Sequence, residues 1–255
     1  MRYIKLLMEY DGTGYQGWQS QPNRMTIQDI LAETIGGITG ERVRLTAASR
    51  TDAGVHALGQ VAVFNTGSGI AEDVLKRALN AKLPGDIRIL SAEETHQAFH
   101  PRYDAKKKRY VYLVMLNNPG SSFFFRYVWH VRTTLASDAM ERAAAHISGT
   151  HDFSVFRGSG CGAKTTVRTI GSIELAVLDR IDFMTMSVPG RYIKIAIEAD
   201  AFLRHMVRNI VGTLVEVGKG RMPVDEIPDI IASRDRTKAG PTSPASGLFL
   251  ERIFY

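Results

Sequence analysis

The chain has 255 residues, of which 32 are lysine or arginine and 26 are aspartate or glutamate, so its formal net charge is +6 with histidine neutral. Apolar residues make up 44% and charged residues 23%, which are ordinary globular values and exclude wholesale disorder. The single cysteine, Cys161, excludes a disulfide framework and a multi-cysteine zinc site, and no run of 18 apolar residues indicates a membrane span. We therefore expect a soluble cytoplasmic protein whose mildly basic charge suits a polyanionic partner.

The first part of the chain predicts strands and helices in alternation. Residues 2–9 place apolar side chains at every second position and run into Asp11-Gly12, which predicts a strand followed by a turn. A helix is expected to begin at Thr26, whose side chain can cap it, and to stop at Gly36-Gly37. The other expected elements are strands over 43–47, 55–64 and 87–90 and a helix over 71–82.

The same order of elements then begins again. A strand is predicted over 109–116 and a helix over 137–148, capped by Ser137 or Asp138. The strongest helical pattern covers 202–217 and would place Arg204 and Arg208 one turn apart on its polar flank. Strands are expected over 170–177, 192–199 and 247–253, with a loop over 238–246. These patterns predict an α+β fold of two similar halves, residues 1–104 and 105–255, with mainly antiparallel sheets.

A glycine string, Gly12-x-Gly14-x-x-Gly17, matches the dinucleotide-binding fingerprint, so a nicotinamide- or flavin-dependent oxidoreductase is one alternative. That fingerprint needs a helix that begins inside the string and meets the pyrophosphate with its N-terminus. The segment from Trp18 to Pro22 is a poor helix start, so a tight loop is the better interpretation. We also expect no metal, because His96 and His100 lack a third ligand at a suitable spacing.

The most specific local feature is the segment 49–57, which reads Ser-Arg-Thr-Asp-Ala-Gly-Val-His-Ala and lies between two expected strands. It holds the guanidinium of Arg50, the carboxylate of Asp52 and the imidazole of His56 among small residues. An arginine two positions from an aspartate can orient the carboxylate or bind a phosphate beside it. A solvated surface turn is the plainer alternative. The residue types favour a functional loop.

Two basic features point to an anion. The run Lys106-Lys107-Lys108-Arg109 continues into the strand that carries Tyr110 and Tyr112, and cations beside aromatic rings suit phosphates and stacked bases. A basic linker followed by core tyrosines is the other interpretation. On the expected helix, Arg204 and Arg208 have no acidic residue at helical spacing, which indicates that one of them faces a carboxylate or a phosphate.

Taken together and in this order, the motifs resemble those of the tRNA pseudouridine synthases of the TruA type. Small departures are Ser49, where relatives often have glycine, and Tyr15, where they often have phenylalanine. The resemblance implies two α+β domains with a central sheet and a cleft, a homodimer with tRNA contacting both subunits, and no cofactor. It is carried by residues 10–19, 50–57, 99–105, 108–112, 151–154, 202–212 and 247–248.

The resemblance also implies a reaction and roles. Uridine at positions 38, 39 and 40 of the tRNA anticodon stem-loop would become pseudouridine, with Asp52 as the catalytic carboxylate, either nucleophile or base. Arg208 would be its ion-pair partner, with Arg204 as the second candidate, and Tyr110 would pack on the target base. Because such a base must leave its stack, Arg50 would fill the gap or hold a flanking phosphate. The remaining substrate contacts would be Leu248 and His205, with Lys106 to Arg109 (Lys108 among them) and Lys164 to Arg168 on phosphates.

A non-catalytic RNA-binding module is the alternative closest to this interpretation. It would need the basic and aromatic residues but would not need Asp52. The two hypotheses therefore differ in whether the side chain of Asp52 is needed for a reaction.

Overall fold

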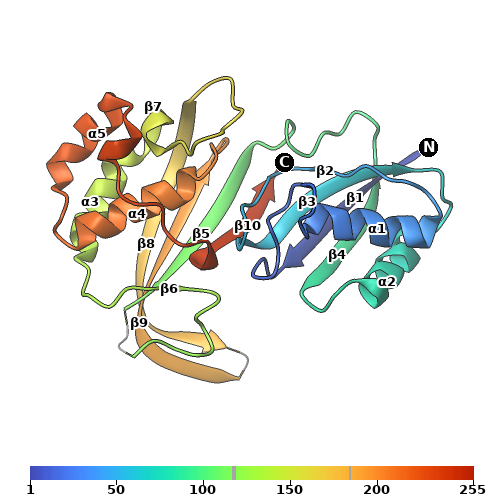
Figure 1. Cartoon of the computed structure of the whole chain (residues 1–255), viewed down its shortest axis with the longest axis horizontal. Coiled ribbons are helices and arrows are strands. Elements are labelled where there is room, and N and C mark those ends of the chain that lie inside the picture. Colours follow the sequence, from blue (N-terminus) through green and yellow to red (C-terminus); the bar gives the residue numbers. More distant parts are fainter. Residues whose placement is uncertain (117–118, 184) are drawn as a thin grey trace. The chain divides into compact units, whose positions relative to one another are not determined.

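The structure is a computed structural model that describes residues 1–116, 119–183 and 185–255 (Figure 1). The chain forms two compact units, Met1–Lys106 with Phe249–Tyr255, and Lys107–Leu248. Both combine helices with mainly antiparallel strands, so the predicted α+β class is confirmed. The sequence predicted a division at residue 104 with all later residues in the second half, but the last residues of the chain belong to the first unit. They lie there because the last strand pairs in parallel with a strand of that unit.

The first unit is built around β1 (Arg2–Tyr10), which pairs antiparallel with β3 (His56–Thr66) on one side and β4 (Ile87–Thr95) on the other. A short strand, β2 (Thr46–Ala47), pairs antiparallel with β3, and β10 (Leu248–Phe254) pairs with β3 in parallel. The buried face of β1 consists of Ile4, Leu6, Met8 and Tyr10, as its alternating pattern predicts.

Two helices, α1 (Ile27–Thr39) and α2 (Glu72–Lys82), lie side by side in this unit (Figure 1). The side chain of Thr26 caps α1 by accepting from the Asp29 N–H at 3.3 Å, as predicted. The expected stop at Gly36-Gly37 is wrong, because α1 continues to Thr39 and ends at Gly40 with a φ of +74°. Leu31 and Ile35 are buried in the turns that lead to the glycine pair, and it is Gly40 that adopts the left-handed conformation that ends the helix.

The second unit contains the antiparallel series β5 (Lys107–Met115), β9 (Met186–Ala199), β8 (Val167–Phe183) and β7 (Gly149–Asp152). A further short strand, β6 (Trp129–His130), pairs with β5 in parallel. Strands β8 and β9 are longer than predicted because their antiparallel pairing extends, with two register shifts, beyond the apolar stretches that the sequence marks.

Helices α3 (Ser137–Ile147), α4 (Met206–Gly218) and α5 (Ile227–Ser233) complete the second unit. The predicted side-chain cap of α3 is wrong, because Ala136 occupies the cap position and no side chain bonds there. The start of α4 is also later than predicted. His205 has a φ of +60°, so Arg204 and His205 precede the helix and only Arg208 lies on it. Single 3₁₀ turns cover Phe153–Phe156 (η1), Val224–Glu226 (η2), Arg236–Lys238 (η3) and Ala245–Gly247 (η4).

Candidate active site

The acidic loop, residues 48–55, connects β2 to β3 and is held by the glycine-rich segment that follows β1. The N–H of Trp18 donates to the Thr51 carbonyl at 3.0 Å, and the N–H of Gly54 donates to the Tyr15 carbonyl at 3.3 Å. The two loops therefore fix each other by main-chain hydrogen bonds on both sides of Asp52.

Two of the three glycines of the string, Gly12 and Gly17, are needed for this packing. Gly17 has a φ of +86°, and a Cβ there would lie 2.6 Å from the Thr51 carbonyl oxygen. A Cβ at Gly12 would collide with the carbonyl oxygen of Val55. The next helix, α1, begins only at Ile27, so the string lacks the helix start that a dinucleotide site requires. Close approach of two loops accounts for Gly12 and Gly17 without a nucleotide.

A buried polar network supports the acidic loop from the sheet below it. The hydroxyl of Tyr10 lies 2.7 Å from Thr51 Oγ1, and burial raises the pKa of Tyr10 to about 12. The amide of Gln60, fully buried on β3, donates to the Ser49 carbonyl at 2.8 Å. Ser49 and Thr51 are thus anchored on either side of Arg50, whose side chain is exposed, while that of Asp52 is half-buried.

His56, the imidazole of the motif, has a structural position. It is 1% exposed, and its Nδ1 accepts from the Gly12 N–H at 3.1 Å and lies 3.1 Å from Asp11 Oδ1. Its ring stacks on Phe249 of β10 with centroids 4.7 Å apart. His56 therefore joins β3 to the glycine-rich segment and to the last strand.

In the second unit, the predicted base-packing residue Tyr110 lies on β5 and is 6% exposed. Its ring meets that of Phe202 edge-to-face, with centroids 5.1 Å apart and an interplanar angle of 84°. Tyr112, two residues on, donates from its hydroxyl to the Pro244 carbonyl at 2.8 Å, and burial raises its pKa. Both tyrosines make an edge-to-face pair, Tyr112 with Trp129 and Tyr110 with Phe202, and the hydroxyl of Tyr112 is bonded within the protein.

Arg208 lies in the first turn of α4 and is half-buried. Its Nε donates to the Ser243 carbonyl at 2.8 Å, and the Ser243 N–H donates to the Arg208 carbonyl at 3.1 Å. Arg204 is exposed, and its carbonyl accepts from the Gly158 N–H at 2.8 Å. A Cβ at Gly158 would lie 2.7 Å from the His205 ring, so the Arg204-His205 corner packs directly on this glycine.

The basic run, Lys106 to Arg109, lies mostly on β5, and three of its residues are paired or buried within the protein. Lys107 pairs with Glu198 at 2.9 Å, and Arg109 pairs with Glu174 at 2.8 Å, which lowers the pKa of that glutamate. Lys108 is only 6% exposed. These positions limit the phosphate contacts that the sequence suggested for Lys108 and Arg109. By contrast, the side chains of Lys164 and Arg204 are exposed.

The predicted site residues divide between the two units. Arg50 and Asp52 belong to the first, whereas Tyr110, Arg204, His205 and Arg208 belong to the second, together with Leu248, which is 4% exposed at the start of β10. The supporting residues Tyr10 and Gln60 were not predicted. Gln60 carried a signal, since it is an amide in the middle of β3 with the apolar run Val61 to Phe64 directly after it.

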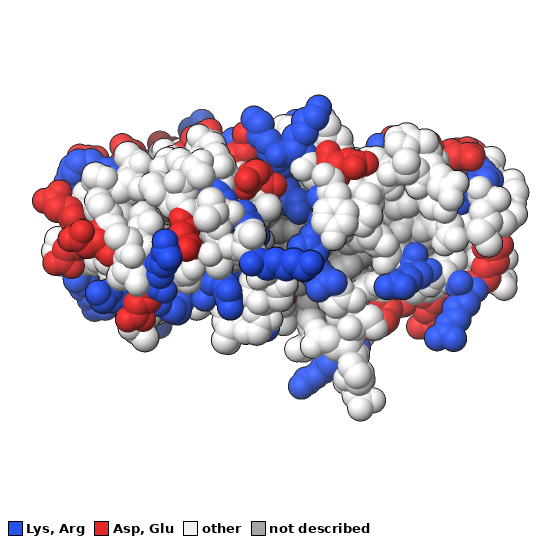
Figure 2. Space-filling model, turned by 90° about the horizontal axis from the view of Figure 1, so that it is seen from above, with Lys and Arg blue, Asp and Glu red and all other residues white. Residues whose placement is uncertain are grey.

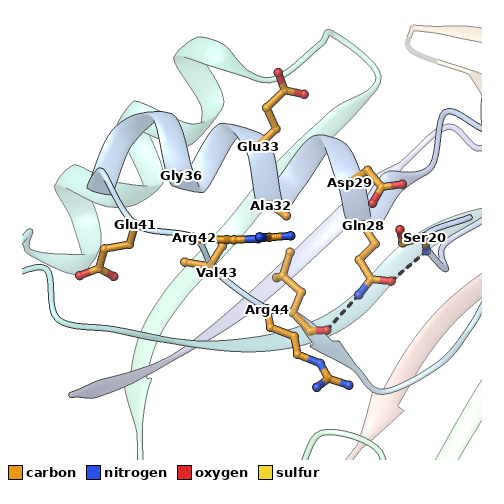
Figure 3. A pocket seen from close by; sticks show the side chains of 11 residues that line it. Ser20, Gln28, Asp29, Ala32, Glu33, Gly36, Glu41, Arg42, Val43 and Arg44 are labelled. Carbon is orange, nitrogen blue, oxygen red and sulfur yellow. Dashed lines mark hydrogen bonds between the residues drawn. The ribbon is translucent and has the colours of Figure 1, made fainter. Parts of the chain in front are cut away.

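A cavity of about 430 Å³ lies elsewhere in the first unit, between α1 and residues 41–45 (Figure 3). Gln28 spans it, accepting from the Ser20 N–H at 3.0 Å and donating to the Leu45 carbonyl at 3.1 Å. None of the predicted site residues lines it. Its charged lining is mixed, with Asp29, Glu33, Glu41, Arg42 and Arg44, so it is a poor site for a phosphate.

Lysine and arginine are interspersed with aspartate and glutamate on the face drawn in Figure 2. Across residues 1–116, 119–183 and 185–255, no three His, Cys, Asp or Glu side chains gather in a group that could hold a metal ion. Within those same ranges, no helix has both the length and the apolar character that a membrane span requires.

Comparison with known proteins gives one family. The family described as "tRNA pseudouridine synthase" matches residues 6–104 and 143–255, which include parts of both units. "tRNA pseudouridine synthase A" of Acetivibrio thermocellus is 50% identical over 255 residues and 100% of both chains. The proteins of that name from Thermoanaerobacter sp. and Thermodesulfovibrio yellowstonii are 45% and 42% identical, over 100% and 99% of both chains respectively. On these matches, the chain belongs to the tRNA pseudouridine synthase family.

Proposed function

We propose that this protein isomerises uridine to pseudouridine in tRNA, at positions 38, 39 and 40 of the anticodon stem-loop. Similarity over the whole chain to relatives named tRNA pseudouridine synthase A is the observation that carries the activity. The choice of positions rests on the motif resemblance, above all on the segment from Arg50 to Ala57.

The proposed chemistry requires a carboxylate at the sugar and base. The N1–C1′ bond of uridine breaks, the base turns, and a C5–C1′ bond forms; C5 loses its proton and N1 gains one, so no redox partner is consumed. Asp52 acts on this centre as nucleophile or as base. Its loop is anchored through Thr51 and Ser49, which supports a role that demands a fixed position.

The second unit supplies the proposed supporting groups. Arg208 is the candidate cation that keeps Asp52 ionised, since a nearby positive charge favours the carboxylate, and Arg204 is the second candidate. Tyr110 packs on the target base, and Leu248 lines the base site. The edge-to-face pair of Tyr110 with Phe202 fixes the ring of Tyr110, which favours stacking at low cost in side-chain entropy.

Binding to the tRNA backbone is proposed for cations that the protein leaves accessible. Lys164, Arg204 and Arg50 are exposed, and Arg50, on the acidic loop, would replace the flipped base or hold a flanking phosphate. Lys108 and Arg109 are weaker candidates because the first is buried and the second is paired with Glu174.

The test uses an unmodified tRNA transcript with uridines at positions 38 to 40. Wild-type protein and Asp52→Ala are compared for pseudouridine formation, mapped by position, while tRNA binding is measured in parallel. Product from wild type alone, with binding retained in the variant, supports the proposal. Equal binding with no product from either protein would instead support the non-catalytic RNA-binding module.

We further propose that the protein acts as a homodimer with tRNA contacting both subunits. Light scattering on purified protein should give twice the 28.2 kDa of one chain. A mass of 28.2 kDa at micromolar concentration, with full activity, would contradict this.

A further inference from the structure

One segment of the second unit, residues 236–244, lies as a strap along α4 and is held by a buried side chain. Asn209, fully buried on α4, accepts through Oδ1 from Arg236 at 2.9 Å and from the Thr242 hydroxyl at 2.6 Å. Its Nδ2 donates to the Phe156 carbonyl at 2.8 Å. A single amide therefore joins both ends of the strap to the helix and to η1.

The strap touches the backbone of α4 directly. A Cβ at Gly212 would collide with the Pro241 carbonyl, and a Cβ at Gly240 would lie 2.6 Å from Thr213 Cα. The Gly240 N–H donates to Thr213 Oγ1 at 2.9 Å. Such close approach leaves the strap little freedom to shift along the helix.

Arg236 forms hydrogen bonds with later residues of the same strap. Its guanidinium donates to the carbonyls of Ala239 at 3.3 Å and Gly240 at 2.9 Å, besides Asn209. Burial lowers its pKa, as expected for a charge surrounded by protein groups. This arginine is thus directed into the fold, unlike the exposed Arg204 and Lys164.

The end of the strap holds Arg208. Ser243 exchanges two hydrogen bonds with that residue, accepting from its Nε at 2.8 Å and donating to its carbonyl at 3.1 Å. The next residue, Pro244, accepts from the Tyr112 hydroxyl at 2.8 Å. The orientation of the Arg208 guanidinium is therefore set by a main-chain carbonyl, whose own place depends on the strap.

We propose that Asn209 and Arg236 are positioning residues, which fix the strap and through Ser243 orient the guanidinium of Arg208 for the reaction. The role in the reaction rests on the proposed function of Arg208. Arg236 acts through contacts inside the protein and does not contact tRNA.

The test compares Arg236→Met with Arg234→Met, a matched control that removes a neighbouring arginine paired with Asp152 at 3.1 Å. A second control, Ile231→Val, lowers stability in the same unit at a buried position on α5, outside residues 236–244. Single-turnover rates of pseudouridine formation and tRNA affinities are measured for each. Arg236→Met should slow the reaction by roughly ten- to a hundredfold, with affinity and its salt dependence within about twofold of wild type. Both controls should keep wild-type rates.

Two further readouts separate positioning from general damage. In an Arg208→Lys background, Arg236→Met should add less than about a twofold loss, because the residue it orients is gone. By NMR, the Arg208 Nε–H should exchange slowly in wild type and lose this protection in Arg236→Met and Asn209→Ala.

A rate for Arg236→Met equal to that of Arg234→Met would overturn the proposal. So would the finding that Arg236→Met slows the reaction by the same factor in the Arg208→Lys background as in wild type. Retained protection of the Arg208 Nε–H would overturn it as well. If wild-type protein makes no pseudouridine, the proposed function fails. The exchange measurement then still decides whether the strap fixes Arg208.

Discussion

Tyr10 shows how one side chain links the sheet to the proposed catalytic loop. Its hydroxyl lies beside Thr51 Oγ1 and accepts from the Gln60 amide at 3.4 Å, and the residue is only 4% exposed. Burial disfavours the phenolate, so the pKa of Tyr10 rises from an ordinary 10.0 to about 12. The folded protein therefore keeps this proton over a pH range in which the unfolded chain loses it.

Replacing Tyr10 with phenylalanine should change stability in two ways. At pH 7 the lost hydrogen bonds should cost about 1 kcal/mol. The stability that the neutral phenol contributes is fully present below pH 10 and is lost as the pH rises from 10 to about 12, by up to roughly 3 kcal/mol. Denaturant unfolding at pH 7, 10 and 12 should therefore show that the free energy of unfolding falls less steeply with pH for Tyr10→Phe than for wild type. The same decline in both proteins would contradict the assignment.

Gly17 tests whether the glycine string serves loop packing. Gly17→Ala should destabilise the protein by about 1–3 kcal/mol, because alanine is strained at a φ of +86° and its Cβ would meet the Thr51 carbonyl. Pseudouridine formation should fall with it, since Thr51 adjoins Asp52. Gly14→Ala is the matched control, because a Cβ there has no atom within 4 Å. Equal melting temperatures for the two variants would contradict the packing role.

At the scale of single residues, the sequence identified the acidic loop but not its supports. The string from Arg50 to His56 is recognisable because charged groups stand among small residues. The bond from Gln60 to Ser49 is invisible in sequence, because its partners meet only when β3 passes beneath the loop. The pairing of Arg109 with Glu174 was missed for the same reason, since it crosses between strands.

At the scale of elements, α1 shows that packing can override a local stop signal. The pair Gly36-Gly37 continues as helix because the buried positions Leu31 and Ile35 anchor the turns around it. Glycine in a helix interior nonetheless carries an entropic cost of about 1 kcal/mol relative to alanine.

Gly37→Ala should therefore stabilise the protein by roughly 0.5–1 kcal/mol, because a Cβ at this position has open space. Gly36→Ala should gain less, since its Cβ would lie 3.0 Å from the Glu41 carbonyl oxygen. Thermal unfolding of both variants measures the difference. A loss of stability for Gly37→Ala would mean that residue 37 is not in a regular helix.

At the start of α4, by contrast, the sequence predicted helix where the structure has none. Apolar spacing from Phe202 onward suggested a continuous helix, yet His205 adopts a left-handed conformation that glycine or asparagine more often takes. The corner is stabilised by tertiary contacts, among them the bond from Gly158 N–H to the Arg204 carbonyl. Periodicity cannot register such contacts, so Arg204 was wrongly placed one helical turn from Arg208.

At the scale of the whole molecule, the order of the predicted elements indicated the α+β class and the mainly antiparallel strands. It did not indicate that the last strand joins the first unit. Strand β10 pairs with β3, with Phe249 opposite His56, although these residues are far apart in the sequence. No local pattern specifies such a distant parallel partner. The mild net charge of +6 likewise indicated a polyanionic partner without showing which cations remain exposed.

Exposed cations that contact phosphates should make tRNA binding dependent on salt. Lys164→Ala should reduce the steepness of log affinity against log salt concentration by roughly 0.7–0.9, the value for one released counterion. Arg77→Ala is the control, because this arginine pairs with Asp73 on α2 at 3.2 Å and has no proposed contact. Identical slopes for Lys164→Ala and wild type would exclude Lys164 as a phosphate contact.

The most direct measurement is the single-turnover release of tritium from tRNA carrying 5-tritiated uridine, with enzyme in excess. Bond formation at C5 expels that hydrogen, so its release reports the proposed chemistry and not binding. Asp52→Asn keeps the shape of the side chain and should slow release by at least about a hundredfold with tRNA affinity retained, whereas Asp73→Asn on the exposed face of α2 should match wild type. Release by Asp52→Asn at the wild-type rate would contradict the central role of this carboxylate.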